Sequence, residues 1–477
     1  MPTGDKYGHG MIMNENNFLL RILKNPLAMV WGLLSSCCVL FLVFATPPMQ
    51  VPDEQNHFLR VVQIARGGIV GIKLNPLDSG GKIPSDSIKF AHSYDDLPFH
   101  YERKVDWSRV VGETDLRWKS DLQLAGFPNT VIYSPIFYIP SVVGIEIGRI
   151  FQRSIVTSFY ISRIFSGIFC VVLGALALMI AKRGVLLIAM LLSMPMVLFL
   201  FASCSQDGPL IAASALCVGL LTRLDENDEL LETRWFWPVL AILSGSILAS
   251  KPPYILVAFI PLVLGPRHYW RQAAICAGAA IGILMVWSFV GVHSTKVPFL
   301  PGQGVNSGKQ LHFLLTHPTK VFPVLFHTFK YFGMSFKQQF VGVLGWVDAP
   351  LSSWSYRSEK ILFIFCLVGA AFYLKIRFSF EEIVRIILLL LILLGTLTGI
   401  SLALYFIWTP VGRDFIEGIQ GRYFIPLALF SILVLPISTV IRIIPPKNVK
   451  AFEIALVCVS LWISMGSMIE TLLARYW

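Results

Sequence analysis

The stretch AMVWGLLSSCCVLFLVFATPPMQVPDEQNHFLRVVQIARGG, residues 28–68, decides the fold class. Its first part, 28–46, carries no charge and approaches the about 20 apolar residues that a helix needs to cross a bilayer. Further apolar runs lie at roughly 160–181, 184–202, 209–222, 235–250, 254–266, 273–292, 361–375, 384–408, 424–441 and 452–469. These runs are too long for transmembrane β-strands. The sequence therefore predicts an all-α polytopic membrane protein with about eleven spans, within a range of about ten to thirteen.

The composition supports the same class. Of 477 residues, 55% are hydrophobic and 14% are charged, whereas soluble domains have about 25% charged residues. These values exclude a water-soluble fold and intrinsic disorder. The net charge of +11 comes without a basic run or a base-stacking module, so we expect no nucleic-acid partner. The eight cysteines lie in or beside apolar runs, and we expect no disulfide framework.

The loop charges predict the orientation. With the N-terminus on the cytoplasmic side, the inner segments hold 15 Lys and Arg residues and the short outer segments hold five. The long outer loops 47–158 and 293–360 are left out of this count because long loops cross regardless of charge. The bias predicts a multi-pass protein of the plasma membrane with a cytoplasmic N-terminus.

Residues 130–148, TVIYSPIFYIPSVVGIEIG, are apolar enough to span as well. A span here would move every later loop to the other side and invert the charge bias. Pro135, Pro140 and Glu146 also disfavour a simple span. We therefore expect a helix that lies against the outer leaflet or dips into it.

A polar insert at 47–129 follows the first apolar run and carries the candidate chemistry. Pro52, Asp53 and Glu54 are typical of a helix start, and Gly67-Gly68 is typical of its end. Two interpretations of Asp53 stay open: an N-cap, or a general base held at the water–lipid boundary. Asp53 and Glu54 could also hold a divalent cation such as Mg²⁺ or Mn²⁺, although nothing in the sequence requires a cofactor.

Six stretches carry a resemblance to known proteins: VPDEQNHFLRVVQIARGG (51–68), YSPIFYIP (133–140), SCSQDGPLIAAS (203–214), KPPY (251–254), GVLGWVDAPL (342–351) and QGRYFIPL (420–427). In this order they resemble the C-type, polyprenol-phosphate-dependent membrane glycosyltransferases, such as aminoarabinose and protein mannosyl transferases. More specifically, the chain resembles the bacterial family catalogued as domain of unknown function 2142. The resemblance implies a C-type glycosyltransferase fold in the inner membrane, with an extracytoplasmic active site.

The implied reaction is inverting transfer of a sugar from a polyprenyl-phosphate donor, such as an undecaprenyl phosphate, to a glycan or glycolipid acceptor such as O-antigen. Asp53 matches the acid that activates the acceptor hydroxyl, with Glu54 beside it, and Asp207 matches a second acid. Lys251 and Arg422 match basic residues that meet the donor phosphate, and the chemistry adds Arg60 and Arg413. Weaker substrate-binding candidates are His57, Tyr133, Tyr254 and Tyr423. His57 departs from the aminoarabinose transferases, which have an aromatic residue there.

Structural alternatives stay open for several of these residues. Asp207 could be an N-cap, and Lys251 could extend its amine to the membrane surface. Arg422 with Tyr423 could anchor the chain at the interface. Arg413 could pair only with Asp414, and Arg163 could face lipid headgroups.

We expect three modules that pack as one body. Residues 1–292 form the catalytic module with outer loop 47–158, residues 293–360 form a second outer loop with amphipathic segments, and residues 361–477 contribute Arg422. Two other functions stay open: a transporter or flippase of lipid-linked glycans, and an O-antigen polymerase or ligase. Transporters place polar groups at mid-membrane, whereas here the notable charges lie at the predicted ends of spans.

Overall fold

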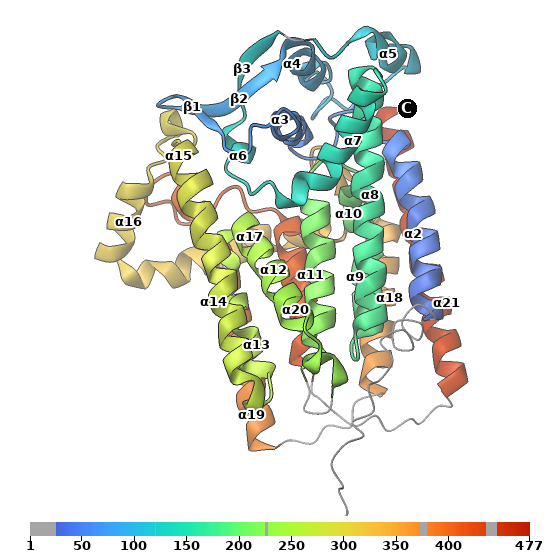
Figure 1. Ribbon diagram of the computed structural model, residues 1–477, viewed down its shortest axis with the longest axis vertical. Helices are drawn as coiled ribbons and strands as arrows, with labels where there is room; N and C mark the ends of the chain where they lie inside the picture. The colour runs from blue at the N-terminus through green and yellow to red at the C-terminus, as the bar shows by residue number, and fades with distance from the viewer. Residues whose placement is uncertain (1–24, 120, 225–227, 373–378, 436–445) are drawn as a thin grey trace, which may run out of the picture.

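A computed structural model describes residues 25–119, 121–224, 228–372, 379–435 and 446–477. The molecule is a bundle of roughly aligned helices with the polar insert across one end (Figure 1). We call this the insert end. The C-terminal residue lies there, whereas α2 (Pro26–Ala45) begins at the opposite end.

Five helical stretches are long and apolar enough to cross a membrane: α2, α8 (Ile155–Ile180), Arg267–Thr295 with α14 (Trp270–Trp287), α19 (Phe380–Ile407) and Lys450–Tyr476 within α21 (Pro446–Tyr476). They confirm the predicted class, a mostly helical membrane protein with several apolar helices.

α18 (Ser353–Phe372) has 20 residues, as many as α2. Other apolar runs form shorter helices: α11 (Asp207–Leu221), α12 (Phe236–Ser250), η4 (Pro252–Phe259) with α13 (Ile260–Leu264), and η9 (Gly421–Phe424) with α20 (Ile425–Ser431) and η10 (Ile432–Val434). The run at 184–202 is divided into α9 (Val185–Leu192) and α10 (Pro195–Phe201), because Pro195 has no N–H for a continuous helix. Residues 373–375 and 436–441 of the predicted runs lie outside the described residues.

The insert corrects the all-α prediction. Beside α3 (Glu54–Ala65), α4 (Ser85–His92), α5 (Trp107–Gly112) and the short η1 (Glu113–Asp115) and α6 (Pro128–Val131), it holds an antiparallel sheet of β1 (Ile72–Asn75), β2 (Asp78–Pro84) and β3 (Leu122–Gly126). Gly80 pairs with Ile72 on one side and Gly126 on the other. A Cβ on Gly80 would overlap the Ala125 carbonyl, so this glycine permits the close pairing. The sheet was missed because the Gly-Gly pair hides the alternation that marks a strand.

Residues 130–148 form η2 (Ile136–Tyr138) and α7 (Ile139–Ile150). A helix of 12 residues is about 18 Å long, which is too short to cross a bilayer. It packs against α8 at the insert end (Figure 1). The geometry agrees with the expectation that this segment does not span.

Aromatic and ionic contacts hold the insert on the bundle. Phe58, Phe90 and Phe159 pack edge to face, with ring centroids 5.4–5.6 Å apart. At the C-terminus, Trp477 stacks on Trp107 at 5.1 Å. Arg475 binds the buried carboxylate of Asp348 at 2.9 Å, near β4 (Val343–Leu344) and β5 (Ala349–Pro350).

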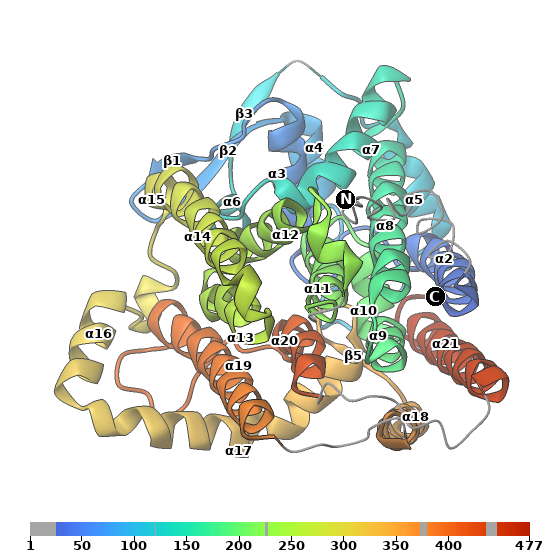
Figure 2. The same cartoon turned by 60° about the horizontal axis from the view of Figure 1, so that its bottom comes forward.

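The segment after α14 surrounds one side of the bundle. It contains η6 (Ser288–Val292), α15 (His293–Thr295), α16 (Ser307–Thr316) and α17 (Val321–Val341), with η7 (Pro301–Gln303) and η8 (Pro318–Lys320) as short turns. The short η5 (Arg267–Tyr269) directly precedes α14. Figure 2 shows α16 and α17 around the outer side of α19. Contacts of α2 with α21 and of α11 with α20 join the N- and C-terminal parts of the chain.

Candidate functional site

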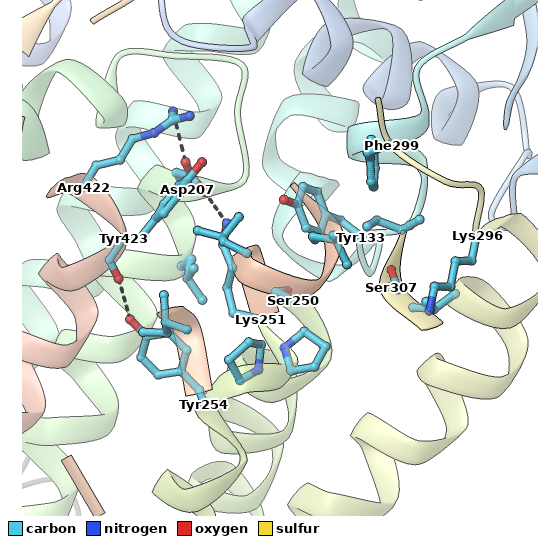
Figure 3. A pocket seen from close by; sticks show the side chains of 18 of the residues that line it. Tyr133, Asp207, Ser250, Lys251, Tyr254, Lys296, Phe299, Ser307, Arg422 and Tyr423 are labelled. Carbon is cyan, nitrogen blue, oxygen red and sulfur yellow. Dashed lines mark hydrogen bonds and ion pairs between the residues drawn. The ribbon is translucent and has the colours of Figure 1, made fainter. Parts of the chain in front are cut away.

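A cavity of ≈ 780 Å³ lies near the insert end. Its wall comes from α11, the α12–η4 junction, η6, the segment 296–307, α19 and η9, together with Ile132 and Tyr133 just before η2, and it is mostly apolar. The charged side chains on this wall are Asp207, Lys251, Lys296 and Arg422. Lys251 and Arg422 contact the Asp207 carboxylate, whereas Lys296 lies on another part of the wall (Figure 3). Figure 3 shows Asp207 between Arg422 and Lys251.

Arg422 is the centre of the charged cluster. It lies in η9 directly after Gly421, and its side chain is 3% exposed. Its guanidinium contacts Asp53 Oδ2 at 2.8 Å and Asp207 Oδ2 at 3.3 Å. Its Nε donates to Gln420 Oε1 at 2.7 Å. These bonds hold a buried cation between two carboxylates, so the interfacial-anchor alternative is wrong.

Lys251 ends α12 and points into the cavity. Its Nζ lies 3.5 Å from Asp207 Oδ1 and 5.0 Å from the ring centroids of both Tyr133 and Tyr423. Two aromatic faces stabilise an ammonium group by cation–π attraction. Lys251 therefore belongs to the site and does not extend to the membrane surface.

Asp207 is the first residue of α11, and the N-cap position belongs to Gln206. The Asp207 carboxylate contacts Lys251 and Arg422. The N-cap alternative is therefore wrong for this residue.

Asp53 occupies the N-cap position of α3 in a left-handed conformation, with φ 61°, and its side chain makes no capping bond. A non-glycine residue in this conformation is strained and is often found at functional sites. Oδ2 contacts Arg422, whereas Oδ1 receives only a long bond of 3.5 Å from Asn129. The side chain is 33% exposed, but Asp53 does not line the cavity. It is separated from the cavity by Arg422.

Glu54 points away from this cluster. Its carboxylate is fully buried and receives Arg163 Nε at 2.9 Å, Arg163 Nη2 at 2.6 Å and the Cys204 N–H at 3.0 Å. Arg163 also donates to the carbonyls of Val43, Thr46 and Pro47. The alternative that Arg163 faces lipid headgroups is therefore wrong, because its side chain is fully buried. Glu54 holds the insert to α8, and we do not retain it as a catalytic group.

Arg60 and Arg413 do not line the cavity. Arg60 is fully buried and donates to Gln63 and to the carbonyls of Gly68, Ile69 and Tyr133. Arg413 pairs with Glu417 at 3.2 Å, so the alternative that it pairs only with Asp414 is wrong. The hydrogen bonds of Arg60 stabilise the fold of the insert. Neither arginine is placed to contact a ligand in the cavity.

Of the four weaker substrate-binding candidates, three line the cavity and one does not. Tyr133, Tyr254 and Tyr423 line the cavity, and Tyr254 donates to the Tyr423 carbonyl at 2.8 Å (Figure 3). His57 does not line it. Its Nδ1 lies 2.6 Å from the Tyr138 hydroxyl, and its ring stacks on Tyr133. Burial lowers the pKa of His57 to about 4, so this histidine is neutral at pH 7. Its ring packs against Tyr133, which lines the cavity.

The part of the chain that the structure describes contains no set of side chains arranged to bind a divalent cation. No three His, Cys, Asp or Glu side chains gather there. The adjacent carboxylates of Asp53 and Glu54 are held by different arginines. The two residues therefore do not form the cation site that their adjacency suggested.

Sequence reasoning missed Lys296 and Asn129. Lys296 follows the short α15 and lines the cavity; its signal was available, because it lies just beyond an apolar run, as Lys251 does. Asn129 donates a long hydrogen bond to Asp53, which lies 76 residues earlier in the sequence. No local sequence pattern predicts such a contact.

The fold and site together define a polytopic membrane protein with a buried charged cluster beside an apolar cavity. The family described as "Predicted membrane protein (DUF2142)" matches residues 37–431, which is most of the chain. The protein belongs to this family. No curated protein and no solved structure shows a significant match.

Proposed function

We propose that this protein is an inverting glycosyltransferase that takes a sugar from a polyprenyl-phosphate donor and transfers it to a surface glycan or glycolipid. The supporting observation is the composition of the cavity wall: three cations and one carboxylate at a site that is otherwise mostly apolar. A second carboxylate, that of Asp53, lies directly behind Arg422.

The cavity suits a lipid-linked phosphate. Apolar side chains of α19, including Ile400, Leu404 and Ile407, line one part of it and suit an isoprenoid chain. Lys251 and Arg422 would bind the phosphate, since charge-assisted hydrogen bonds from Lys and Arg are strong. Lys296 is a third cation on the same wall. Stabilising the departing phosphate is the main electrostatic task of such a transfer.

Asp53 is the proposed general base. The acceptor hydroxyl oxygen would attack the anomeric carbon while the bond from that carbon to the phosphate oxygen breaks. The hydroxyl proton passes to Asp53 Oδ1, and polyprenyl phosphate leaves with the bonding electrons. Because Asp53 is partly exposed and does not line the cavity, the acceptor would approach it from outside the cavity while the donor occupies the cavity.

We further propose that the protein has eleven spans and resides in a bacterial inner membrane, with the insert end extracytoplasmic. The positive-inside bias supports this orientation, and the shorter apolar helices would complete the eleven runs. The alternative of a lipid-linked glycan transporter is less well supported, because the cluster lies where α11, α12 and η9 begin or end. A polymerase or ligase would differ in using pyrophosphate-linked oligosaccharides.

A donor assay with the full chain tests the proposal. Purified protein is incubated with labelled monosaccharides on polyprenyl phosphate or labelled oligosaccharides on polyprenyl pyrophosphate, with extracted envelope glycans as acceptors. We expect transfer from the monosaccharide-phosphate lipid only. Lys251→Gln should reduce it at least about tenfold, whereas Lys73→Gln, on an exposed strand, should not. Transfer only from the pyrophosphate lipid would contradict the proposed donor class, and no transfer from either would contradict the proposal itself.

A further inference from the structure

The segment between α14 and β4 has an unusual charge. Residues 293–347 contain five lysines, four histidines and no Asp or Glu. Lys309, Lys320, Lys330 and Lys337 are exposed. None of these four forms an ion pair with a described residue. A basic surface without internal partners favours binding of an anionic partner.

The inner face of α16 and α17 has a separate structural task. Gln310 accepts from the Gly412 N–H at 3.1 Å, Thr328 from the Ile416 N–H at 2.9 Å and Gln339 from the Gly421 N–H at 2.8 Å. These bonds hold the 412–421 loop that leads to Arg422. The inner face is therefore occupied, and the outer face remains for a partner.

The outer face of α17 combines cations with large apolar side chains. Phe322, Phe326, Lys330 and Lys337 are spaced by four, four and seven residues, which places them on one side of a helix. Phe322 is 75% exposed and Met334 is 68% exposed. The Lys330 amine lies over the Phe326 ring, 6.0 Å from its centroid. On α16, Leu315 is 72% exposed beside the exposed Lys309.

We infer that α16 and α17 form a collar that binds anionic phospholipid at the membrane surface. Helices with lysines among exposed aromatic and aliphatic residues lie in the interface, with the apolar side chains among acyl chains and the amines at headgroups. The position of both helices around the outer side of α19, an apolar helix long enough to span, puts them at the bundle perimeter (Figure 2). This inference does not depend on glycosyl transfer.

Lipid binding by the full-length protein in mixed micelles tests the collar. Fluorescent phosphatidylglycerol is titrated against wild type, Lys330→Gln/Lys337→Gln and the matched pair Lys73→Gln/Lys82→Gln, whose lysines are exposed in the sheet of the insert. We expect the affinity to fall about fivefold for each α17 lysine removed and to change less than about twofold for the matched pair. Equal losses in both pairs, or none in either, would overturn the inference.

Hydrogen–deuterium exchange of the same proteins in nanodiscs locates the effect. Peptides from 307–341 should exchange more slowly in discs with phosphatidylglycerol than in phosphatidylcholine discs, and the α17 pair should abolish the difference. Unchanged exchange elsewhere shows that the variant is folded. Equal protection by soluble glycerol phosphate, or protection by an anionic polysaccharide and not by phosphatidylglycerol, would contradict binding to a lipid surface.

Discussion

Asp53 and Glu54 are adjacent carboxylates with opposite surroundings. Glu54 is fully buried against Arg163, whereas Asp53 is partly exposed and shares Arg422 with Asp207. The sequence pattern placed both residues at a helix start, and that much was predictable. Which carboxylate faces the cluster depends on the left-handed backbone of Asp53, which a pattern of residue types does not show.

This contrast predicts different effects on stability. Glu54→Gln leaves Arg163 as a buried cation without its carboxylate, so we expect the free energy of unfolding to fall by about 3–5 kcal/mol. Asp53→Asn keeps the size of a partly exposed side chain and should cost less than about 1 kcal/mol. Chemical unfolding of both variants in detergent measures the two values. Similar losses would show that the two ion pairs do not differ in this way.

His57 predicts a pH dependence of stability. Burial lowers its pKa from 6.5 to about 4, with Arg422 and Lys251 acting in the same direction and Asp207 and Asp53 opposing. Between these values the unfolded chain binds more protons than the folded protein, so the free energy of unfolding falls as the pH falls from about 6.5 to 4. Its contribution over this window is up to about 3 kcal/mol.

Unfolding midpoints at several pH values, compared with those of His57→Gln, check this dependence. The variant should show a flatter profile over the same window because it lacks the titrating group. Identical profiles would mean that the pKa of His57 is the same in the folded and unfolded protein, which would contradict the shift caused by burial.

At the scale of elements, α17 and η9 are packed too closely for any side chain at Gly421. A Cβ there would overlap the Phe336 carbonyl and lie 2.7 Å from the Phe340 nitrogen. We therefore expect Gly421→Ala to lower the free energy of unfolding by about 1–3 kcal/mol and to displace the loop that carries Arg422. Gly333→Ala on α17 meets no atom within 4 Å and should be neutral or slightly stabilising.

Thermal unfolding and hydrogen exchange of the 420–427 peptide measure both variants. Faster exchange of this peptide in Gly421→Ala alone is the expected result. Equal behaviour of the two variants would contradict the role of α17 as the support of Arg422.

The elements differ in how well the sequence predicted them. Long apolar runs predicted α2, α8 and α19, because one uniform property determines a membrane helix. The sheet of the insert was missed, because Gly80 and Gly81 permit close approach without forming an apolar face. The cluster was partly predictable: Lys251, Asp207 and Arg422 lie at ends of runs, but their mutual distances depend on packing between segments 44 to 215 residues apart.

At the scale of the whole molecule, the account predicts opposite exposure of the two ends. Glu102 lies in the insert and Arg267 at the far end of the bundle, and both side chains are well exposed, at 70% and 82%. A membrane-impermeant maleimide should label Glu102→Cys in intact spheroplasts and label Arg267→Cys only after lysis. The unmodified chain supplies the background from native cysteines. The reverse pattern would place the insert in the cytoplasm.

The most direct test of the central claim is transfer by Asp53→Asn at saturating donor. The purified variant is compared with wild type and with Asp414→Asn, using the donor and acceptor that wild type accepts, and donor binding is measured on the same samples. The account predicts that Asp53→Asn binds the donor but transfers sugar at least about 100-fold more slowly, while Asp414→Asn behaves as wild type. Transfer by Asp53→Asn at the wild-type rate would contradict the assignment of Asp53 as the base.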